Sequence, residues 1–174
     1  MDDHASQKEI KHDITMNIIT YTKIRLQNLL KRQIANKDCN FYLNDKSYAV
    51  MDSSWLKGDC YKAYKRWLGL AGINKWKTNW DCDNFAQSFK MYVNILHARE
   101  NPETFTTKHA GAKNTTDAHA AAVGVMFFKN SDRSAHAVNM VIAENDEILF
   151  FEPDGGAFLN LNNKHKESIW YVNF

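Results

Sequence analysis

Two separated segments of the chain carry residue types that could do nucleophilic chemistry. The first, WDCDNFAQSF at 80–89, places Cys82 at the start of a helix. The second, HAVNMVIAENDEILFFEPDGG at 136–156, places His136 at the start of a β-hairpin that ends in acidic residues. A thiol, an imidazole and a carboxylate that meet in a fold make a nucleophilic cysteine site. The pattern therefore indicates a chemistry, although it names no substrate.

The surroundings of Cys82 act in opposite directions on its sulfur. Unsatisfied N–H groups and the positive end of the dipole at a helix N-terminus favour the thiolate, which is the nucleophilic form. Asp81 and Asp83 lie on either side and disfavour it. A functional site must therefore neutralise these acids, either by using Asp81 as the N-cap or by binding a hard cation such as calcium to both. The alternative is that Cys82 is only a buried member of an apolar helix stripe.

Two acids compete to orient His136, and the hairpin loop decides between two geometries. A two-residue loop at Asn145-Asp146 would pair position 139 with 152, so that Glu152 would point away from His136. A three-residue loop or a bulge shifts the register and puts Glu152 on the face of His136. A working site therefore predicts an odd loop. Glu152 is favoured over Asp154 because it ends the strand where the backbone is still fixed.

Two further residues could support such a site. Asn139 is polar within an apolar strand, and it either fixes the backbone near the site or faces solvent. Trp80 precedes Asp81, and it either walls a cleft or is a core aromatic.

The elements that must position these residues follow from hydrophobic periodicity. Apolar residues at i, i+3, i+4 and i+7 from Cys82 predict an amphipathic helix that ends before Asn101-Pro102. The polar segment 101–118 is predicted to be a surface loop. Helices come first and antiparallel strands second, which is an α+β pattern. The other expected elements are helices over 6–36 and 55–71 and strands over 120–128, 136–143, 147–152 and 168–174.

Size and composition limit the classes of protein that this sequence can encode. The chain has 174 residues, 44% of them hydrophobic and 24% charged, which is typical of one globular domain. A net charge of +2 is too balanced to indicate nucleic acid as a partner, and no apolar run approaches the ~20 residues of a membrane helix. Three cysteines without a CxxC pair argue against a disulfide framework and a structural zinc site. The N-terminus has no signal-peptide pattern, so a cytoplasmic protein is expected, with export by another route left open.

The two chemical segments resemble a known family. WDCDNFA is similar to the nucleophile segment of the papain-like and transglutaminase-like cysteine protease superfamily, and HAVNMVI followed by FFEPDGG is similar to its histidine and acid strands. The resemblance implies an α+β fold in which N-terminal helices, including a central cysteine-bearing helix, pack on a C-terminal antiparallel sheet. It implies one domain, with a helical extension over 1–54 and a cysteine-protease-like core over 55–174. Some members need calcium, which assigns Asp81 and Asp83 as calcium ligands.

The resemblance also assigns roles and a function. Cys82 is expected to be the nucleophile, His136 the base and Glu152 the orienting acid, with Asp154 as the alternative acid. The expected activity is that of a cysteine hydrolase, in the first place a peptidase, acting through a thioester acyl-enzyme on a peptide or protein. The alternatives are acyl transfer of the transglutaminase or amidase type on the same residues, and a non-catalytic papain-like interaction module. No cofactor is required apart from the calcium considered above, no nucleic acid or membrane partner is expected, and the oligomeric state stays open.

Overall fold

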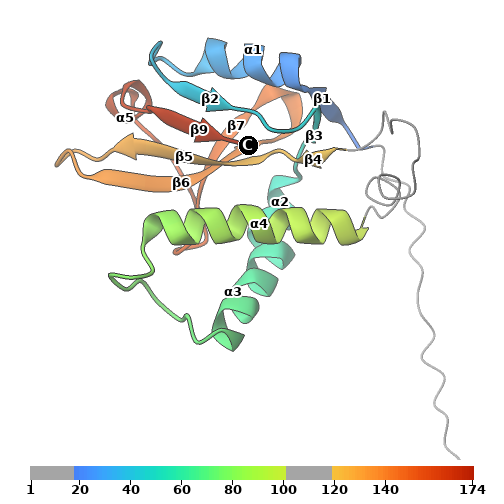
Figure 1. Ribbon diagram of the computed structural model, residues 1–174, viewed down its shortest axis with the longest axis vertical. Coiled ribbons are helices and arrows are strands. Elements are labelled where there is room, and N and C mark those ends of the chain that lie inside the picture. The colour runs from blue at the N-terminus through green and yellow to red at the C-terminus, as the bar shows by residue number, and fades with distance from the viewer. Residues whose placement is uncertain (1–17, 101–118) are drawn as a thin grey trace, which may run out of the picture.

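The structure is a computed structural model, and it describes residues 18–100 and 119–174. In the described part, helices and strands alternate along the chain and form one layered unit (Figure 1). The helical elements are α1 (Lys23–Gln33), α2 (Ser53–Trp55), the π-helical turn η1 (Leu56–Cys60), α3 (Tyr61–Leu70), α4 (Cys82–Glu100), the 3-10 turn η3 (Glu144–Asp146) and α5 (Asn163–Glu167). The strands are β1 (Thr20–Thr22), β2 (Asn40–Tyr42), β3 (Ser47–Ala49), β4 (Ala120–Ala121), β5 (Val123–Lys129), β6 (Ala135–Ile142), β7 (Ile148–Glu152), β8 (Ala157–Leu159) and β9 (Tyr171–Asn173).

The strands form two sheets with mixed pairing. The larger sheet has six strands in the order β2-β9-β5-β6-β7-β8, and β2 pairs with β9 in parallel while the other pairs are antiparallel. The smaller sheet has the order β1-β3-β4, in which β3 and β4 are parallel. Strands from residues 20–49 therefore take part in both sheets.

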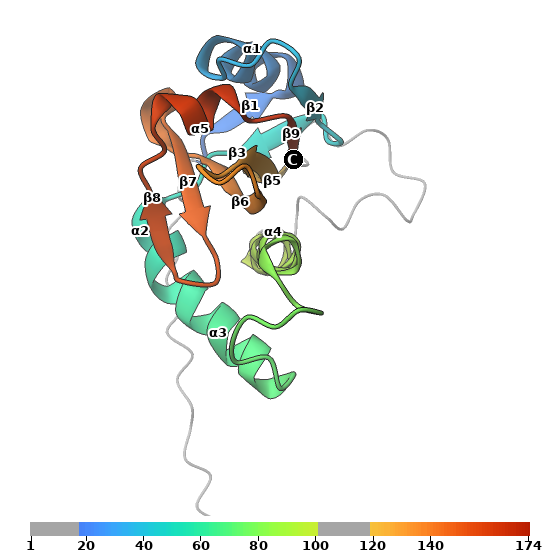
Figure 2. The same cartoon turned by 90° about the vertical axis from the view of Figure 1, so that its left-hand side faces the viewer.

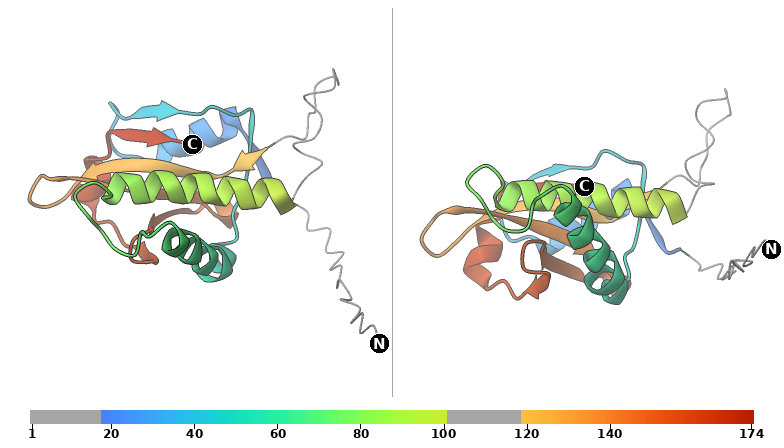
Figure 3. Two further views of the ribbon diagram at one scale, coloured as in Figure 1. Left: turned by 60° about the horizontal axis from the view of Figure 1, so that its bottom comes forward. Right: turned by 90° about the horizontal axis from the view of Figure 1, so that it is seen from below.

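The six-stranded sheet separates two hydrophobic cores (Figure 2), because successive residues of a strand point to opposite faces. On one face, Leu26, Leu29 and Leu30 of α1 pack over Val138 and Met140 of β6. On the other face, α4 lies along β5 and β6, and α3 crosses next to it (Figure 3). This second core carries the helix on which Cys82 lies.

Helix α4 begins at Cys82, as the sequence predicts, and its apolar stripe fixes its orientation. Phe85, Phe89 and Val93 are fully buried against the sheet and α3, while Gln87 and Met91 on another face are exposed. Burying an aromatic or aliphatic side chain of this kind stabilises the fold by about 1.5–3 kcal/mol. The start of α4 is thereby held against the end of β6 that carries His136.

The sequence prediction of a helix over 6–36 is confirmed at Lys23–Gln33 and wrong at Thr20–Thr22, and residues 6–17 lie outside the described residues. Residues 20–22 form β1, whose Tyr21 is buried opposite Tyr48 of β3. Thr22 then caps α1 by accepting a hydrogen bond from the Arg25 N–H at 3.2 Å. Tertiary pairing of the buried Tyr21 overrides the helical periodicity before that cap.

The fold-class prediction also needs correction in its sheet. The prediction placed N-terminal helices on a C-terminal antiparallel sheet, whereas β2 joins the large sheet in parallel beside β9. Residues 40–42 and 171–173 meet only in the folded chain, and no local pattern specifies that pairing. The helical extension predicted over 1–54 thus contains three strands and one full-length helix in its described part.

The hairpin of β6 and β7 has the odd loop that the sequence analysis requires of a working site. Ile142 pairs with Ile148 and Asn139 with Phe151, and the Ala143 N–H donates to the Glu147 carbonyl. The loop between them is the three-residue turn Glu144–Asp146, in which Asn145 has a φ of 59°. This register puts Glu152 on the same face as His136.

The turn after β7 predicts a strong glycine effect. Gly156 has a φ of +69°, and a Cβ added there would overlap the ring of Tyr61, whose hydroxyl donates to the Asp154 carbonyl at 3.0 Å. Gly156→Ala is therefore expected to lower the free energy of unfolding by about 2 kcal/mol or more, measured by urea denaturation. Gly58→Ala is the matched control, since a Cβ there meets no atom within 4 Å. Equal stability of the two variants would contradict the role assigned to Gly156.

No helix in the described ranges is long and apolar enough to cross a membrane.

Candidate functional site

Cys82 is the first residue of α4 and is half-buried at the sheet surface. Its side chain packs beside a small cluster formed by Ala86, Val125 and Ala137. The sulfur therefore lies at a helix N-terminus, where unpaired backbone N–H groups favour a negative charge. Cys39 and Cys60 are buried, and burial raises the pKa of the Cys39 thiol to about 11. Of the three thiols, Cys82 alone is partly accessible.

The structure brings His136 and Glu152 together with Cys82. The His136 Nε2 atom lies 2.7 Å from the Glu152 Oε2 atom, which leaves Nδ1 for the sulfur. Hydrogen bonding to Cys82, followed by hydrogen bonding to Glu152, raises the pKa of His136 to about 9, although burial of the ring acts the other way. The imidazole is therefore a cation at neutral pH, held between a sulfur and a carboxylate. This is the arrangement of a polarised thiol.

Asp154 does not take the position of the orienting acid. Its main-chain N–H lies 3.5 Å from the Glu152 Oε1 atom, and its carbonyl accepts the Tyr61 hydroxyl at 3.0 Å. The main-chain N–H of Asp154 thus contacts the Glu152 carboxylate, and that carboxylate in turn binds the imidazole of His136.

Asn139 is fully buried and ties the cysteine-bearing helix to the sheet. Its Nδ2 group donates to the Ala86 carbonyl of α4 at 2.8 Å and to the Gly124 carbonyl of β5 at 3.2 Å. A helix carbonyl and a strand carbonyl therefore share one amide, which fixes the first turns of α4 over β5 and β6. The Asn139 Oδ1 atom is buried without a hydrogen-bond partner in the described residues.

The two acids beside Cys82 interact with each other. A hydrogen bond with Asp81 is the largest cause that raises the pKa of Asp83, followed by burial and the charge of Asp81. The Asp81 N–H donates to the Asn84 Oδ1 atom at 3.2 Å, and the Asp81 Oδ1 atom is buried without a hydrogen-bond partner among the described residues. In residues 18–100 and 119–174, no group of three or more histidine, cysteine or acidic side chains could hold a metal ion. Calcium binding by Asp81 and Asp83 stays a prediction of the sequence.

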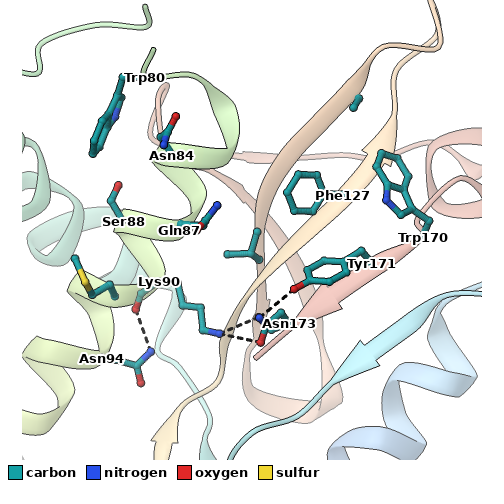
Figure 4. A pocket seen from close by; sticks show the side chains of 13 residues that line it. Trp80, Asn84, Gln87, Ser88, Lys90, Asn94, Phe127, Trp170, Tyr171 and Asn173 are labelled. Carbon is teal, nitrogen blue, oxygen red and sulfur yellow. Dashed lines mark hydrogen bonds between the residues drawn. The ribbon is translucent and has the colours of Figure 1, made fainter. Parts of the chain in front are cut away.

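A pocket of about 950 Å³ opens beside this constellation, between α4 and the strands β5 and β9 (Figure 4). We call it the α4–β9 pocket. Aromatic rings stand on both sides of it: Trp80 before α4, and Phe127, Trp170 and Tyr171 from the sheet. The polar groups come mainly from α4 and β9, and the lining comprises Trp80, Asn84, Gln87, Ser88, Lys90, Met91, Asn94, Val125, Phe127, Ala135, Trp170, Tyr171 and Asn173.

The sequence analysis identified only Trp80 among the residues that line this pocket. A usable signal was present, because Asn84, Gln87, Ser88 and Met91 repeat at i, i+3, i+4 and i+7 along a second face of α4. Trp170 and Tyr171 gave no comparable signal, since aromatic residues in a C-terminal strand are as typical of a hydrophobic core as of a pocket lining. Only the pairing of β9 with β5 places them opposite α4.

Comparison with solved structures finds lectins with a similar fold. A structure of a PSL1a–E64 complex superposes with a TM-score of 0.64 at 25% identity, covering 89% of this chain and 51% of that chain. A structure of Polyporus squamosus lectin bound to the glycan Neu5Acα2-6Galβ1-4GlcNAc superposes with a TM-score of 0.63 at 23% identity, covering 89% of this chain and 49% of that chain. The chain thus spans about half the length of these proteins. No protein-family model and no curated protein sequence matches the chain.

These findings correct the predicted family, fold class and function. The chains that share the fold are lectins, so membership of the papain-like and transglutaminase-like superfamily, and the fold class named after it, do not stand. The cysteine hydrolase or peptidase function, its acyl-transfer alternatives and the papain-like interaction module are overturned by the same matches. Short segments around a cysteine and a histidine describe a local geometry, and such a geometry recurs on unrelated folds.

Proposed function

We propose that this chain binds a carbohydrate in the α4–β9 pocket. The observation that carries the proposal is the lining, which combines the rings of Trp80, Phe127 and Trp170 with the side-chain amides of Asn84 and Gln87. Aromatic walls with a few placed polar groups are typical of pockets that take small ligands.

The chemistry of a sugar ring fits this lining. A pyranose has faces of C–H groups and edges of hydroxyl groups, and the negative face of an aromatic ring attracts the slightly positive C–H hydrogens. A hydroxyl both donates and accepts a hydrogen bond, and the amides of Asn84, Gln87 and Asn94 offer both functions. Trp170 and Phe127 lie with their ring centroids 5.9 Å apart, so they offer an extended apolar surface opposite the amides of α4.

The lectin comparison supports the same ligand class. The Polyporus squamosus lectin was solved with a bound sialylated glycan, and this chain covers about half of that protein. We therefore propose a glycan in place of the peptide or protein substrate that the sequence analysis expected as partner.

Binding to immobilised neutral and acidic glycans, followed by titration calorimetry on the best ligand, tests this proposal. Trp170→Ala is expected to weaken binding about ten-fold, because it removes one aromatic wall. Trp76→Ala is the matched control, since Trp76 is exposed and lies outside the pocket lining. Failure of the wild-type protein to bind any glycan, or equal weakening by both variants, would overturn glycan binding in this pocket.

As a second candidate, we propose that Cys82 is a reactive thiol, with His136 as its proton carrier and Glu152 as the group that holds the ring. The close approach of these three side chains favours it. In the step proposed, the thiol reacts with an epoxide reagent: the sulfur forms a bond to an epoxide carbon, the carbon–oxygen bond breaks, and the oxygen takes the imidazolium proton. The proposal covers adduct formation and does not extend to hydrolysis.

Three features near Cys82 support this second proposal. Asn139 positions α4, and Trp80 lines the α4–β9 pocket with its ring edge-on to Phe85. Asp81 and Asp83 are proposed as ligands of a calcium ion, whose charge would offset theirs beside the sulfur. Comparing the rate of Cys82 labelling in calcium with the rate in a chelator tests the calcium site separately from the reactive thiol.

A further inference from the structure

Positive charge is concentrated in one segment of this chain. Residues 60–80 contain five of its 22 lysine and arginine residues and none of its 20 acidic residues, so the rest of the chain is net negative. The net charge of +2 for the whole chain therefore conceals a basic segment. This segment comprises α3, which lies on the opposite side of the molecule from α1, and the turn that leads from α3 to α4 (Figure 1).

The five cations of this segment differ in their partners. Lys62 lies 3.8 Å from Asp59, although both side chains are exposed and such an ion pair contributes little. The Lys65 amine lies 5.8 Å from the centre of the Phe85 ring and is directed back towards α4. The remaining three cations are exposed and form no ion pair with any described residue: Arg66, Lys75 and Lys77.

Two large apolar side chains are exposed beside these three cations. Leu70, the last residue of α3, is 91% exposed, which is the highest value among the large hydrophobic side chains of residues 18–100 and 119–174. Trp76 is 53% exposed and stands between two lysines in the sequence. Single exposed apolar residues are common on protein surfaces, but here two of them share one short segment that projects beyond α4 (Figure 2). We call this segment, residues 66–77, the α3 tip.

The α3 tip has a defined main-chain conformation that leaves its apolar side chains uncovered. The Ile73 N–H donates to the Leu68 carbonyl at 2.9 Å, and the Ile73 side chain packs against the core that lies under α4. The main chains of Lys77 and Trp80 exchange two hydrogen bonds, each of 2.9 Å. Since the turn is already ordered, binding of a partner to the α3 tip loses little conformational freedom.

We propose that the α3 tip binds the surface of a membrane that contains anionic lipids. Three cations without acidic partners complement the negative charge of such a surface, and each strengthens binding about five-fold. Leucine and tryptophan side chains enter the boundary between head groups and acyl chains, where tryptophan is enriched in membrane proteins. A nucleic acid would pair with the cations and stack on Trp76, but it would leave Leu70 exposed. A lipid surface engages all five side chains.

Sedimentation of the full chain with vesicles tests this proposal. One probe is a vesicle of phosphatidylcholine alone, and the other contains equal parts of phosphatidylserine and phosphatidylcholine. The wild-type chain is expected to partition at least about ten-fold more strongly into the anionic vesicles, and added salt is expected to narrow the difference. Lipids with brominated acyl chains are expected to quench tryptophan fluorescence, and Trp76→Phe should lose most of this quenching because the other described tryptophans are less exposed.

A charge-reversal variant and its matched control assign the lipid preference to the α3 tip. Lys75→Glu combined with Lys77→Glu is expected to abolish the preference for anionic vesicles. Lys23→Glu combined with Lys31→Glu changes the net charge by the same amount on α1, and it is expected to retain the preference. All four lysines are exposed, so the variants are expected to fold.

A second pair of variants tests the apolar contribution. Leu70→Ser is expected to weaken partitioning into anionic vesicles about five- to ten-fold, because the leucine no longer enters the membrane boundary. Ile24→Ser is the matched control, since Ile24 is 70% exposed on α1.

The outcomes decide for or against a lipid surface. Equal partitioning of the wild-type chain into both kinds of vesicle overturns the proposal, and so does an equal loss in the α1 variants. Binding to an oligonucleotide that the Lys75→Glu, Lys77→Glu variant removes, with no binding to vesicles, would assign the α3 tip to nucleic acid and overturn the lipid proposal. Glycan binding in the α4–β9 pocket is independent of these outcomes.

Discussion

Alkylation at pH 7 is expected to modify Cys82 about ten-fold faster than a free thiol and to leave Cys39 and Cys60 unmodified. A free cysteine with a pKa of about 8.5 is only about 3% thiolate at this pH, and the thiolate is the attacking form of a thiol. The cation of His136 lies beside the Cys82 sulfur, where it attracts the negative charge that develops during attack. Iodoacetamide followed by peptide mapping measures the three rates in one sample.

The dependence on pH follows from the direction of the His136 shift. Its pKa is raised to about 9, so the ring keeps its proton from acid pH up to that value and loses it above. The rate of labelling at Cys82 is therefore expected to be high already at pH 6–7, where an ordinary thiol is slow. A profile that rises only near pH 8.5, as for a free thiol, would contradict the ion pair.

Three variants and two reagents decide which groups act on the sulfur. His136→Ala is expected to bring the rate at Cys82 back to that of a free thiol, and Glu152→Gln to lower it by a smaller factor. His165→Ala is the control, because His165 contacts Phe128 as His136 does but takes no part in the proposed site. An epoxide reagent should add its mass to Cys82 alone. Unchanged labelling in His136→Ala would show that Cys82 is only a packed residue.

The largest effect on stability is expected from Phe151→Ala, with a loss of about 3–5 kcal/mol in the free energy of unfolding. Phe151 is fully buried, and its ring stacks on Phe89 of α4 at 4.8 Å between centroids. It also meets Tyr61 at 5.6 Å and Phe158 at 5.3 Å, so one side chain joins α3, α4, β7 and β8. Urea denaturation measures the change as a lower midpoint with an unchanged slope.

The neighbouring residue provides the control for this prediction. Phe150→Ala removes the same number of atoms from a half-buried side chain on the opposite face of β7, and a smaller loss is expected. Phe151→Leu keeps most of the volume and serves if the alanine variant does not fold. A loss below about 1 kcal/mol for Phe151→Ala, or one equal to that of Phe150→Ala, would mean that the aromatic cluster is not the centre of this core.

Local sequence determined the elements that carry the thiol. The stripe Phe85, Phe89 and Val93 specifies α4 and its buried face, because a period of 3.6 residues belongs to a helix. Local sequence leaves the hairpin loop open between two residues and three, and it predicts an odd loop only on the condition that Glu152 share a face with His136. The structure has the three-residue turn Glu144–Asp146. Helix α4 depends on neighbours in the chain, so a single sequence contains it.

The tertiary structure decided what local patterns do not encode. Parallel pairing of β2 with β9 joins residues 40–42 to 171–173, and the pairing of β9 with β5 places Trp170 opposite α4. The α4–β9 pocket and the hydrogen bonds from Lys90 to Asn173 exist only because those distant segments meet. The fold-level likeness to lectins likewise depends on the whole arrangement, which two short segments around a cysteine and a histidine do not specify. Hydrophobic periodicity fixes which face of an element is buried, whereas the choice of partner depends on packing between segments far apart in the chain.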